Sequence, residues 1–331
     1  MTTRDDADGA RNAGAWALAV ELYAKAANEA PARDLAAECL ALRGLALLAT
    51  GEPRGWLDFE QRFSAPGRDL HAFPRDDLYW CGDPTSSLLI WAEGGRGNTI
   101  QFMRYVNAVA ARFVLPIVLA VHREMVELVR DHLVSGDVDV IAVDAAVLAK
   151  HGEEHCSILS LPAIFAFKAW PDPLVPPLAR APRRRLPLRI GLNWAGNPSY
   201  WDDARRSFAA YPFGPLEDLI PKVLLSELQA SPAVMASPAT LGEDFARETM
   251  AELAGLDLVV TTDTAMAHLA GALGIPTWLL LHDACNWRWA PQGPATVGPL
   301  RYESVRIFRA PTTGPDLVAN VRSALVAELA R

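Results

Sequence analysis

The sequence is poor in cysteine, and none of its cysteines are spaced as Cys-x-x-Cys. The four that it contains stand far apart, at positions 39, 81, 156 and 285. This spacing argues against a zinc ribbon and against the disulfide framework of a small secreted domain. We therefore expect a reducing compartment, the cytoplasm.

Long hydrophobic runs and an excess of basic residues are missing as well. No apolar run approaches the ~20 residues that span a bilayer, and the N-terminal MTTRDDADGARNAG has no apolar core of a signal peptide. The net charge of −8, from 31 basic and 39 acidic side chains, argues against a protein that coats duplex nucleic acid. The three arginines at 183–185 lie among prolines, so we interpret them as a solvated linker face.

The chain has 331 residues, 51% of them hydrophobic, which is enough for two domains and a smaller N-terminal segment. Within that segment, 1–64, we expect helices over 15–63. Two helices of consecutive tetratricopeptide repeats are indicated by the spacing of Ala19, Tyr23, Ala26 and Pro31, then of Gly44, Leu47 and Gly51. An ordinary helical hairpin is the alternative. Since a solenoid needs roughly three repeats, these helices must lean on the rest of the chain or on a partner.

Strands and helices alternate through the rest of the sequence. Strands are expected at 87–92, 116–121 and 139–143, with helices at 100–113, 122–133 and near 145–151. A proline-rich linker, 171–187, precedes a second alternation. Its strands are expected within 188–196 and at 256–263, 276–281 and 304–308, with a short apolar segment at 223–225 and helices near 215–220, 244–254, 264–274 and 315–330. This rhythm predicts an α/β protein with two doubly wound domains, 65–180 and 181–331, facing a cleft.

The stretch WAEGGRGNTIQFMRY (91–105) leads from a strand through glycines 94, 95 and 97 into a helix. Free backbone N–H groups at such a helix start suit a phosphate or another oxyanion, and glycine leaves room for the ligand. The spacing is not that of a dinucleotide-binding G-x-G-x-x-G loop. A plain tight turn is the alternative.

The stretch LDLVVTTDTAMAHLAGALG (256–274) joins a buried strand to a helix at Thr262, Asp263, Thr264 and Ala265. Its amides and helix dipole would face an anion. His268 lies one turn further and could reach the same anion, although a structural role is the alternative. In GLNWAGNPSYWDDARRSF (191–208), a strand feeds a loop that ends in Arg205 and Arg206, two arginines that either clamp a diphosphate or are simple surface charge.

Together these motifs resemble the heptosyltransferase-like glycosyltransferases (family 9), in the bacterial branch joined to tetratricopeptide repeats. WAEGGRGNTIQFMRY is similar to that family's A-E-Q-G-x-G-D-x-I-Q-F-x-R-Y loop. GWLDFEQRF (55–63), GLNWAGNP and DDARRS each resemble a family motif, and NWRW (286–289) is close to the family's D-W-R-W. The resemblance covers nearly the whole chain. It implies a GT-B fold, a sugar nucleotide between the domains, metal-independent transfer with inversion, and a last helix, 315–330, that crosses back to the first domain.

The resemblance also implies roles for individual residues. On the donor side they are Asn193, Trp194, Gly196, Asn197, Ser207, Thr262, Asp263, Thr264, Ala265 and His268, and on the acceptor side Gly94, Gly95, Gly97 and Gln101. Arg206 would help to neutralise the leaving group, and a protein acceptor could dock on the N-terminal helices. The sugar nucleotide is a co-substrate, and no metal or other cofactor is expected.

Three further patterns are more simply structural. The triplet DVD (137–139) looks like a metal-binding DxD, but it opens a strand. HGEEH (151–155) satisfies the HxxEH of one metalloprotease class, but Gly152 and the strand-like residues that follow make an ordered helix improbable. Cys156 lies among apolar residues, which favours a plain buried thiol.

The residue that opens the glycine-loop helix is Asn98, where the family has an aspartate thought to take the acceptor's proton. An amide cannot accept that proton, although a positioned base contributes ~10²–10⁴-fold. Asn286 departs from the family in the same sense. Glu93 could serve as the base, or a residue of the 71–80 loop such as His71 or Asp77.

Asn98 is equally compatible with a site in which the protein supplies no base. The acceptor could need no strong base or bring its own ionised nucleophile, the protein could bind without turnover, and an introduced Asp-to-Asn replacement would give the same sequence. A weakened enzyme predicts that Asn98→Asp raises turnover, whereas a non-catalytic binding module predicts background activity in both forms. A nucleotide-sugar epimerase on a similar scaffold would act without an acceptor.

Overall fold

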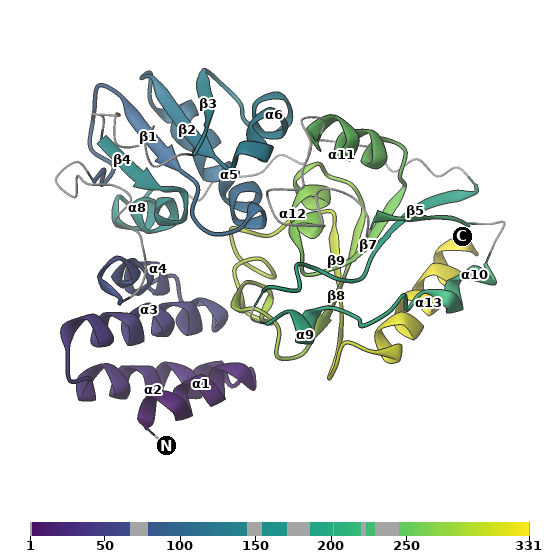
Figure 1. Cartoon of the computed structure of the whole chain (residues 1–331), viewed down its shortest axis with the longest axis horizontal. Helices are drawn as coiled ribbons and strands as arrows, with labels where there is room; N and C mark the ends of the chain where they lie inside the picture. Colours follow the sequence, from purple (N-terminus) through teal and green to yellow (C-terminus); the bar gives the residue numbers. More distant parts are fainter. Residues whose placement is uncertain are drawn as a thin grey trace.

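A computed structural model describes residues 2–66, 79–143, 154–170, 186–200, 202–219, 223–228 and 245–330. Several predictions fall outside these ranges: the base candidates His71 and Asp77, the helix near 145–151 and nearly all of the linker 171–187. Within the described part, the chain forms a helical N-terminal segment and two parallel sheets (Figure 1).

The N-terminal segment consists of α1 (Thr3–Asn12), α2 (Trp16–Glu29), α3 (Arg33–Ala49), α4 (Gly55–Phe59) and a 3₁₀ turn, η1 (Glu60–Ser64). The prediction of helices over 15–63 is confirmed, but α1 was not expected. This helix buries only Ala7 and Ala10, too few apolar positions for a periodic pattern, and it starts with a capping box between Thr2 and Asp5.

The first three helices pack together in the order of the chain (Figure 1). Ala19, Tyr23 and Ala26, which carried the predicted spacing, form the buried face of α2. They share a hydrophobic cluster with α1 and with Leu42 and Ala46 of α3. The assignment of this bundle to tetratricopeptide repeats stays a prediction.

Gly44 brings α3 against α4. A Cβ at Gly44 would lie 2.6 Å from both the Gly55 carbonyl oxygen and the Phe59 amide nitrogen, and backbone atoms cannot move aside. We expect Gly44→Ala to lower the free energy of unfolding by about 1–3 kcal/mol. Gly9→Ala is the matched control.

Gly9 is also helical, but nothing lies within 4 Å of its added Cβ. The free energy of unfolding of the Gly9→Ala control should therefore rise by about 0.5–1 kcal/mol, because alanine is the better helix former. Urea unfolding of both variants measures the two changes, and a Gly44→Ala protein as stable as the parent would contradict the close approach.

The first sheet has the strand order β3-β2-β1-β4, with every pair parallel. Its strands are β1 (Leu88–Trp91), β2 (Ile117–Val121), β3 (Val138–Ala142) and β4 (Glu154–Ser157). Helix α5 (Arg96–Arg112) connects β1 to β2, and β4 is followed by η6 (Ile158–Ser160) and α8 (Leu161–Phe167). The predicted βαβ rhythm of this part is confirmed.

One local prediction for this sheet is confirmed with a different helical geometry, and one was wrong. The expected helix at 122–133 is a continuous helical segment over 123–133, made of η4 (Arg123–Met125), α6 (Val126–Leu128) and the π turn η5 (Val129–Leu133), and it buries its apolar residues on one side. The strand-like stretch 156–162 contains only the end of β4, and Pro162 then begins α8 in the first turn, where proline is tolerated.

The second sheet is also parallel throughout, with the strand order β6-β5-β7-β8-β9. Its strands are β5 (Leu188–Asn193), β6 (Val223–Glu227), β7 (Leu258–Thr262), β8 (Thr277–His282) and β9 (Val305–Ala310). The other elements are α9 (Asp203–Arg206), α10 (Gly214–Glu217), α11 (Phe245–Ala254), α12 (Ala265–Ala272), η9 (Trp287–Trp289) and α13 (Pro315–Leu329). The fold is therefore α/β with two doubly wound parallel sheets, as predicted.

The expected crossing of the last helix to the first domain is not seen. Helix α13 packs on β8, β9 and α10, away from the first sheet (Figure 1). Its apolar face, Leu317, Val321 and Leu325, is buried in a cluster made of residues from the second sheet and its helices. Because this face completes that core, the helix stays with the second sheet.

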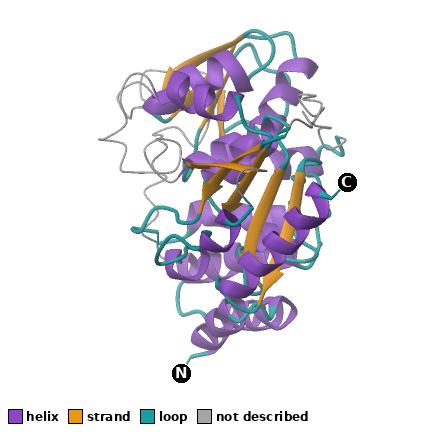
Figure 2. Ribbon diagram, turned by 90° about the vertical axis from the view of Figure 1, so that its right-hand side faces the viewer, coloured by secondary structure: helices purple, strands orange, loops and turns teal. Residues whose placement is uncertain are grey.

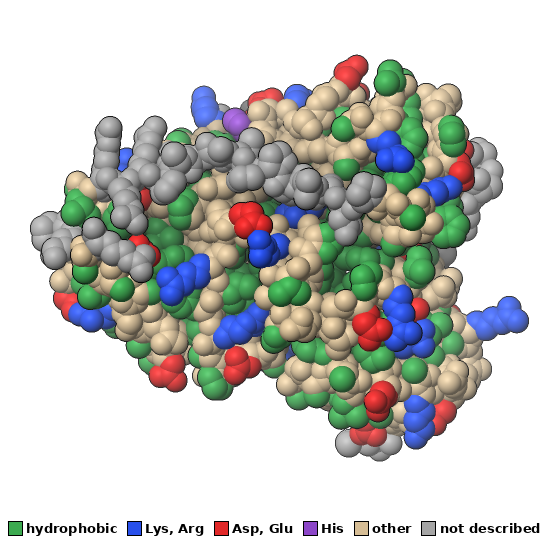
Figure 3. Space-filling view, turned by 180° about the vertical axis from the view of Figure 1, so that it is seen from behind, with side chains coloured by type: hydrophobic (Ala, Val, Ile, Leu, Met, Phe, Trp, Pro, Cys, Tyr) green, Lys and Arg blue, Asp and Glu red, His purple; other side chains and the backbone are tan. Residues whose placement is uncertain are grey.

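Helices α5 and α12 pack against each other and join the two sheets in one hydrophobic core (Figure 1). Helix α11 adds contacts with α6 and η4. Seen from the side, the N-terminal helices form one end of the molecule (Figure 2). The face turned away in Figure 1 carries acidic and basic side chains interspersed (Figure 3). No helix in the described ranges has the length and apolar character that a membrane span requires.

Candidate functional site

A cavity of about 740 Å³ lies where the N-terminal helices, the loop after β1 and the loops after β5, β7 and β8 meet. Ligands of open α/β sheets bind at the carboxyl ends of the strands, which is where this cavity lies. It brings together most of the residues singled out in the sequence: Glu93, Gly94, Gly95, Gly97, Asn98, Gly196, Asn197, Arg206, Asp263, Thr264, Ala265 and His268.

Three of the predicted site residues do not line the cavity but support the strands and loops that do. Asn193 is fully buried, and its Oδ1 accepts hydrogen bonds from Thr261 Oγ1 at 2.8 Å and Thr264 Oγ1 at 3.1 Å. Thr262 is also fully buried, at the end of β7. Ser207 Oγ accepts a hydrogen bond from the Gly196 amide at 2.9 Å, so it holds the loop rather than lining the cavity.

Two other predicted site residues, Trp194 and Gln101, are not among the residues that line the cavity. Trp194 packs edge-on against Tyr211, with ring centroids 5.3 Å apart, and contacts the core of the second sheet. Gln101 is fully buried on α5, and its amide has no hydrogen-bond partner among the described residues. Their predicted roles in binding substrate remain predictions that the cavity geometry does not favour.

The start of α12 forms one wall of the cavity. The buried strand β7 delivers Asp263 and Thr264 to this edge, and the extended backbone of Thr264 begins the helix at Ala265. The first backbone N–H groups of a helix have no partner within it. With the helix dipole they form a site of positive potential, which favours an anion.

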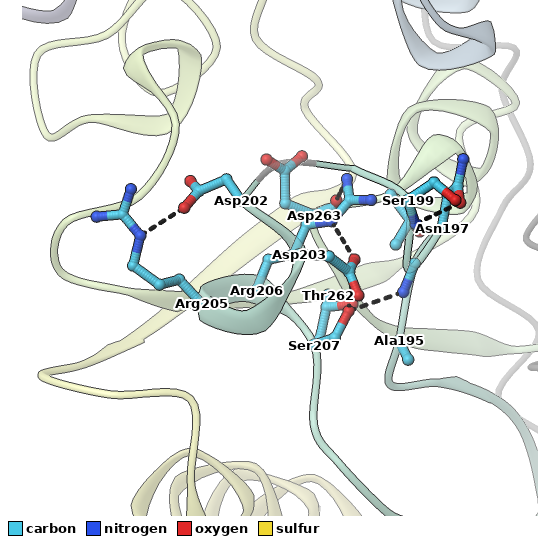
Figure 4. Close-up of polar contacts among 12 residues, drawn as sticks. Ala195, Asn197, Ser199, Asp202, Asp203, Arg205, Arg206, Ser207, Thr262 and Asp263 are labelled. Atoms are coloured by element: carbon cyan, nitrogen blue, oxygen red, sulfur yellow. Dashed lines mark hydrogen bonds and ion pairs between the residues drawn. The ribbon is translucent and has the colours of Figure 1, made fainter. Parts of the chain in front are cut away.

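Arg206 lies at the same end of the second sheet, beside the carboxyl end of β7 (Figure 4). Its Nε donates to Asp203 Oδ1 at 2.9 Å and its Nη1 to the Asp263 carbonyl oxygen at 2.9 Å, while the guanidinium lies 4.3 Å from the centre of the Tyr200 ring. A Cβ at Gly196 would lie 2.5 Å from Arg206 Nη2, so a larger residue there would displace the guanidinium from its observed position. The arginine is thereby fixed beside the start of α12.

The loop after β5 is held by local hydrogen bonds (Figure 4). Asp203 Oδ1, besides pairing with Arg206, accepts from Ser207 Oγ at 2.9 Å. Asn197 Oδ1 accepts from the Ser199 amide at 2.9 Å, which closes a short turn. The loop is thus built before any ligand binds.

Asp263 lines the cavity and is partly buried. Its Oδ1 accepts a hydrogen bond from Trp289 Nε1 at 2.8 Å. Burial raises the pKa of its carboxyl above the ordinary value, although Arg206 opposes the shift. The side chain is a hydrogen-bond acceptor fixed in orientation by the indole.

His268 is also buried, stacked on Trp289 with ring centroids 5.5 Å apart, and its Nδ1 lies 3.3 Å from the Tyr302 hydroxyl oxygen. Burial lowers its pKa to about 3, and the nearby Arg288 adds to the shift. The imidazole is therefore neutral near pH 7. A Cβ at Gly97 would lie 2.9 Å from His268 Cδ2, so glycine permits the glycine loop to contact this ring.

Asn98 uses both ends of its amide. Its Nδ2 donates to the Glu93 carbonyl oxygen at 3.3 Å, and its Oδ1 accepts from Arg288 Nη2 at 2.7 Å. Gly94 has a positive φ of 75°, and a Cβ there would collide with the Asn98 amide. An aspartate could not make the hydrogen bond to the carbonyl oxygen, so this geometry suits an amide.

Arg288 was not singled out in the sequence, although it lies within the NWRW motif. Its Nη1 donates to Asn286 Oδ1 at 3.2 Å, and its guanidinium lies over the Trp287 ring. The two asparagines that depart from the family pattern, Asn98 and Asn286, therefore share one arginine. Only a contact between residues far apart in the chain reveals this.

Glu93 faces the N-terminal helices. Its carboxylate accepts hydrogen bonds from Arg62 Nε at 2.9 Å, from Arg62 Nη2 at 2.8 Å and from Ser157 Oγ at 2.5 Å. Arg62 also donates to Ser160 Oγ and to Glu60 Oε1. With its lone pairs engaged, Glu93 is placed as a structural anchor, which weakens the prediction that it acts as a base.

The N-terminal helices form another wall of the cavity, which the sequence did not predict. Its polar part comes from Arg11 and Asn12, whose carbonyl oxygen accepts from Arg205 Nη1, and its apolar part from Trp16, Leu42 and Leu45. The sequence indicated only that these helices must lean on the rest of the chain or on a partner, because a solenoid needs roughly three repeats.

The structural interpretations of the remaining motifs hold where the structure describes them. Asp139 lies in β3, and Glu154 and His155 of the HGEEH pattern lie in β4 rather than in a helix. In the described residues, no three His, Cys, Asp or Glu side chains lie together in a way that could hold a metal ion. Burial raises the pKa of the Cys156 thiol well above its ordinary value, so it is a plain buried thiol.

No protein-family model matches the sequence, and no curated protein matches it. Among solved structures, the chain is similar to the E. coli heptosyltransferase WaaC with ADP at 14% identity, over 73% of this chain and 99% of that chain, with a TM-score of 0.46.

Two further structures give similar values. The E. coli ADP-heptose LPS heptosyltransferase II is 13% identical over 73% of this chain and 99% of its own, with a TM-score of 0.47. The iron-containing dodecameric glycosyltransferase TibC of enterotoxigenic E. coli is 10% identical over 75% of this chain and 77% of its own, with a TM-score of 0.45. At these values we draw no functional argument from the likeness.

Proposed function

We propose that this protein is a GT-B glycosyltransferase that moves a sugar from a sugar nucleotide to an acceptor without a metal and with inversion of the anomeric centre. The observation that carries the proposal is the cavity between the two sheets, where the start of α12 and Arg206 converge on one point. The sequence motifs that resemble family 9 line this same cavity.

The donor's diphosphate would bind at the start of α12. The free N–H groups there, the helix dipole and the guanidinium of Arg206 all favour an anion. Gly196 and Asn197 would then contact the nucleoside, and Asp263, a fixed acceptor, would bind sugar hydroxyls. The neutral imidazole of His268 would add a hydrogen bond rather than a charge.

Catalysis would come from orientation of the two substrates and from stabilisation of the departing diphosphate. Negative charge accumulates on that group as the bond to the anomeric carbon breaks. Arg206 is fixed before the reaction by Asp203 and the Asp263 carbonyl oxygen, so little reorganisation is needed. The acceptor would occupy the side of the cavity formed by the glycine loop and the N-terminal helices, where a protein could dock.

A non-catalytic binding protein is the second candidate, and one observation favours it. Each carboxylate in the described cavity lining already has a partner: Glu93 pairs with Arg62, Asp202 with Arg205, Glu124 with Arg96, and Asp263 with Trp289. With Asn98 at the helix start, none of these groups is an evident base. Binding without turnover would need no base.

A thermal-shift screen against a panel of sugar nucleotides tests the donor site. A ligand at 100 times its dissociation constant should stabilise the protein by about 2.7 kcal/mol. We expect at least one nucleotide sugar to do so, and Arg206→Met and Asp263→Ala to abolish the response. Arg322→Met is the matched control, because Arg322 also pairs with an aspartate but lies partly exposed on α13, outside the cavity lining.

A flat response across the panel, or an unchanged response in Arg206→Met, would argue against the donor site. Release of the nucleoside diphosphate from the stabilising donor then separates the two candidates. A transferase releases it in the presence of an acceptor, whereas a binding protein leaves release at background.

A further inference from the structure

Arg288 differs from the other arginines of the cavity in the partners that it has. Arg206 pairs with Asp203, Arg205 with Asp202, and Arg96 lies 3.9 Å from Glu124. Within the described ranges, Arg288 makes no ion pair, and its side-chain partners are two amides. Arg288 is therefore a cation of the cavity lining that no described carboxylate neutralises through an ion pair.

The contacts of Arg288 leave part of its guanidinium unused. Nη2 donates to Asn98 Oδ1 and Nη1 to Asn286 Oδ1, while the buried Nε has no partner among the described residues. Burial lowers the pKa of Arg288 below its ordinary value, with Asp263 favouring the charge from further away. Removing a guanidinium from water without a counter-ion is costly. A ligand that supplies the negative charge would recover that cost.

Arg288 lies on the acceptor side of the cavity. Its hydrogen bond to Asn98 joins it to the loop after β1, at a sequence separation of 190 residues. Arg206, in contrast, is bound to the Asp263 carbonyl oxygen beside the start of α12, the proposed diphosphate site. These different hydrogen-bond partners are the basis for assigning each arginine its own anion.

We propose, on the basis of the proposed transferase function, that Arg288 binds an acceptor through a carboxylate or phosphate group, and that this oxyanion is itself the nucleophile. A guanidinium matches the geometry of such a group. One of its oxygens would form the bond to the anomeric carbon as the bond from that carbon to the diphosphate breaks. The diphosphate leaves with the electron pair, and no proton is transferred.

This assignment explains both asparagines. An ionised nucleophile needs no general base, so the aspartate expected at 98 has no proton to take. Carboxylates at 98 and 286 would pair with Arg288 and repel the acceptor, whereas amides orient the guanidinium and leave its charge for the ligand. The apolar part of the wall, Trp16, Leu42 and Leu45, suits an acceptor whose anion is attached to an apolar group.

Isothermal titration with three small molecules that share a phenyl ring tests the site: benzoate, phenyl phosphate and benzyl alcohol. We expect at least one anion to bind the full-length protein at least 10-fold more tightly than the alcohol. The tighter of the two anions identifies the acceptor group as a carboxylate or a phosphate. Arg288→Met should lose this preference, and the partly exposed Arg322→Met should keep it.

Asn98→Asp is the second variant; it exchanges the hydrogen bond to the Glu93 carbonyl oxygen for an ion pair with Arg288, and circular dichroism checks that it folds. It should weaken anion binding at least 10-fold. Equal binding of the alcohol and the anions, or unchanged anion binding in Asn98→Asp, would overturn the proposal. Displacement of the anion by a stabilising nucleoside diphosphate would also overturn it, because Arg288 would then belong to the donor site.

The two proposals fail in different ways. If no sugar nucleotide stabilises the protein but the anion preference depends on Arg288, the transferase function is wrong and the anion site remains. If nucleotides stabilise the protein and the anions do not bind, the donor site remains and the oxyanion acceptor is wrong.

Discussion

Arg62→Ala is expected to lower the free energy of unfolding by about 3–5 kcal/mol. The side chain is fully buried, between the rings of Phe59 and Phe63, and pairs with the carboxylates of Glu60 and Glu93. Burial opposes its charge, but Glu60 and Glu93 raise the pKa of Arg62 above its ordinary value. Its removal would leave two carboxylates without their cation at the junction of the N-terminal helices and the first sheet.

Arg43→Ala is the control for this prediction. Arg43 lies in the same helical segment and pairs with Asp58 at 2.8 Å, but both side chains are partly exposed, at 29% and 22%. Such a pair contributes about 0–1 kcal/mol. Urea unfolding followed by tryptophan fluorescence compares the two variants. Similar losses in both would show that the buried network around Arg62 does not hold the segment in place.

Acidification is expected to destabilise the native protein through His268. Its pKa is about 3 in the folded protein and 6.5 ordinarily, so below pH 6.5 the unfolded chain binds a proton that the folded protein does not. The stabilisation is complete above pH 6.5 and is lost as the pH falls towards 3. The loss is about 1.4 kcal/mol for each pH unit, or about 2.7 kcal/mol at pH 4.5.

His268→Gln isolates this contribution, because glutamine does not titrate in this range and can still bond to Tyr302. Urea unfolding at pH 7.5, 5.5 and 4.5 measures the free energy of unfolding of both proteins. As the pH falls, the parent should lose more of this free energy than the variant does. If the two proteins lose stability in parallel on acidification, the imidazole is not held neutral by the fold.

The strands with continuous apolar runs were predictable from the sequence. LLIW, LVVTT and TWLLLH form β1, β7 and β8 close to the expected limits, because strands buried on both faces need apolar residues throughout. The start of α12 followed from the same stretch, since the strand ends in Thr and Asp and small residues come next. Local chemistry is sufficient for these elements.

Elements without such a pattern were missed. Helix α1 contains mostly polar residues and is fixed by its capping box and by its packing on α2. Strand β4 is only four residues, EHCS, and takes its conformation from pairing with β1. Tertiary contacts determine the conformation of both α1 and β4, and the sequence pattern of a single segment does not reveal such contacts.

The site was predictable as a set of loops but not as a set of contacts. The glycine loop and the start of α12 do line one cavity. However, the hydrogen bond between Asn98 and Arg288 and the ion pair between Arg62 and Glu93 join residues that no spacing rule connects. The wall from the N-terminal helices was missed for the same reason.

The position of the N-terminal helices limits how the two α/β units can move. The helices are anchored to the first unit through Arg62 and Glu93 and to the second through edge-on packing of Trp56 on Trp287 and the hydrogen bond from Arg205 to Asn12. A hinge rotation that separated the units would have to break one of these anchors. A wider opening of the cavity between the units would therefore require the helical segment to detach from one of them.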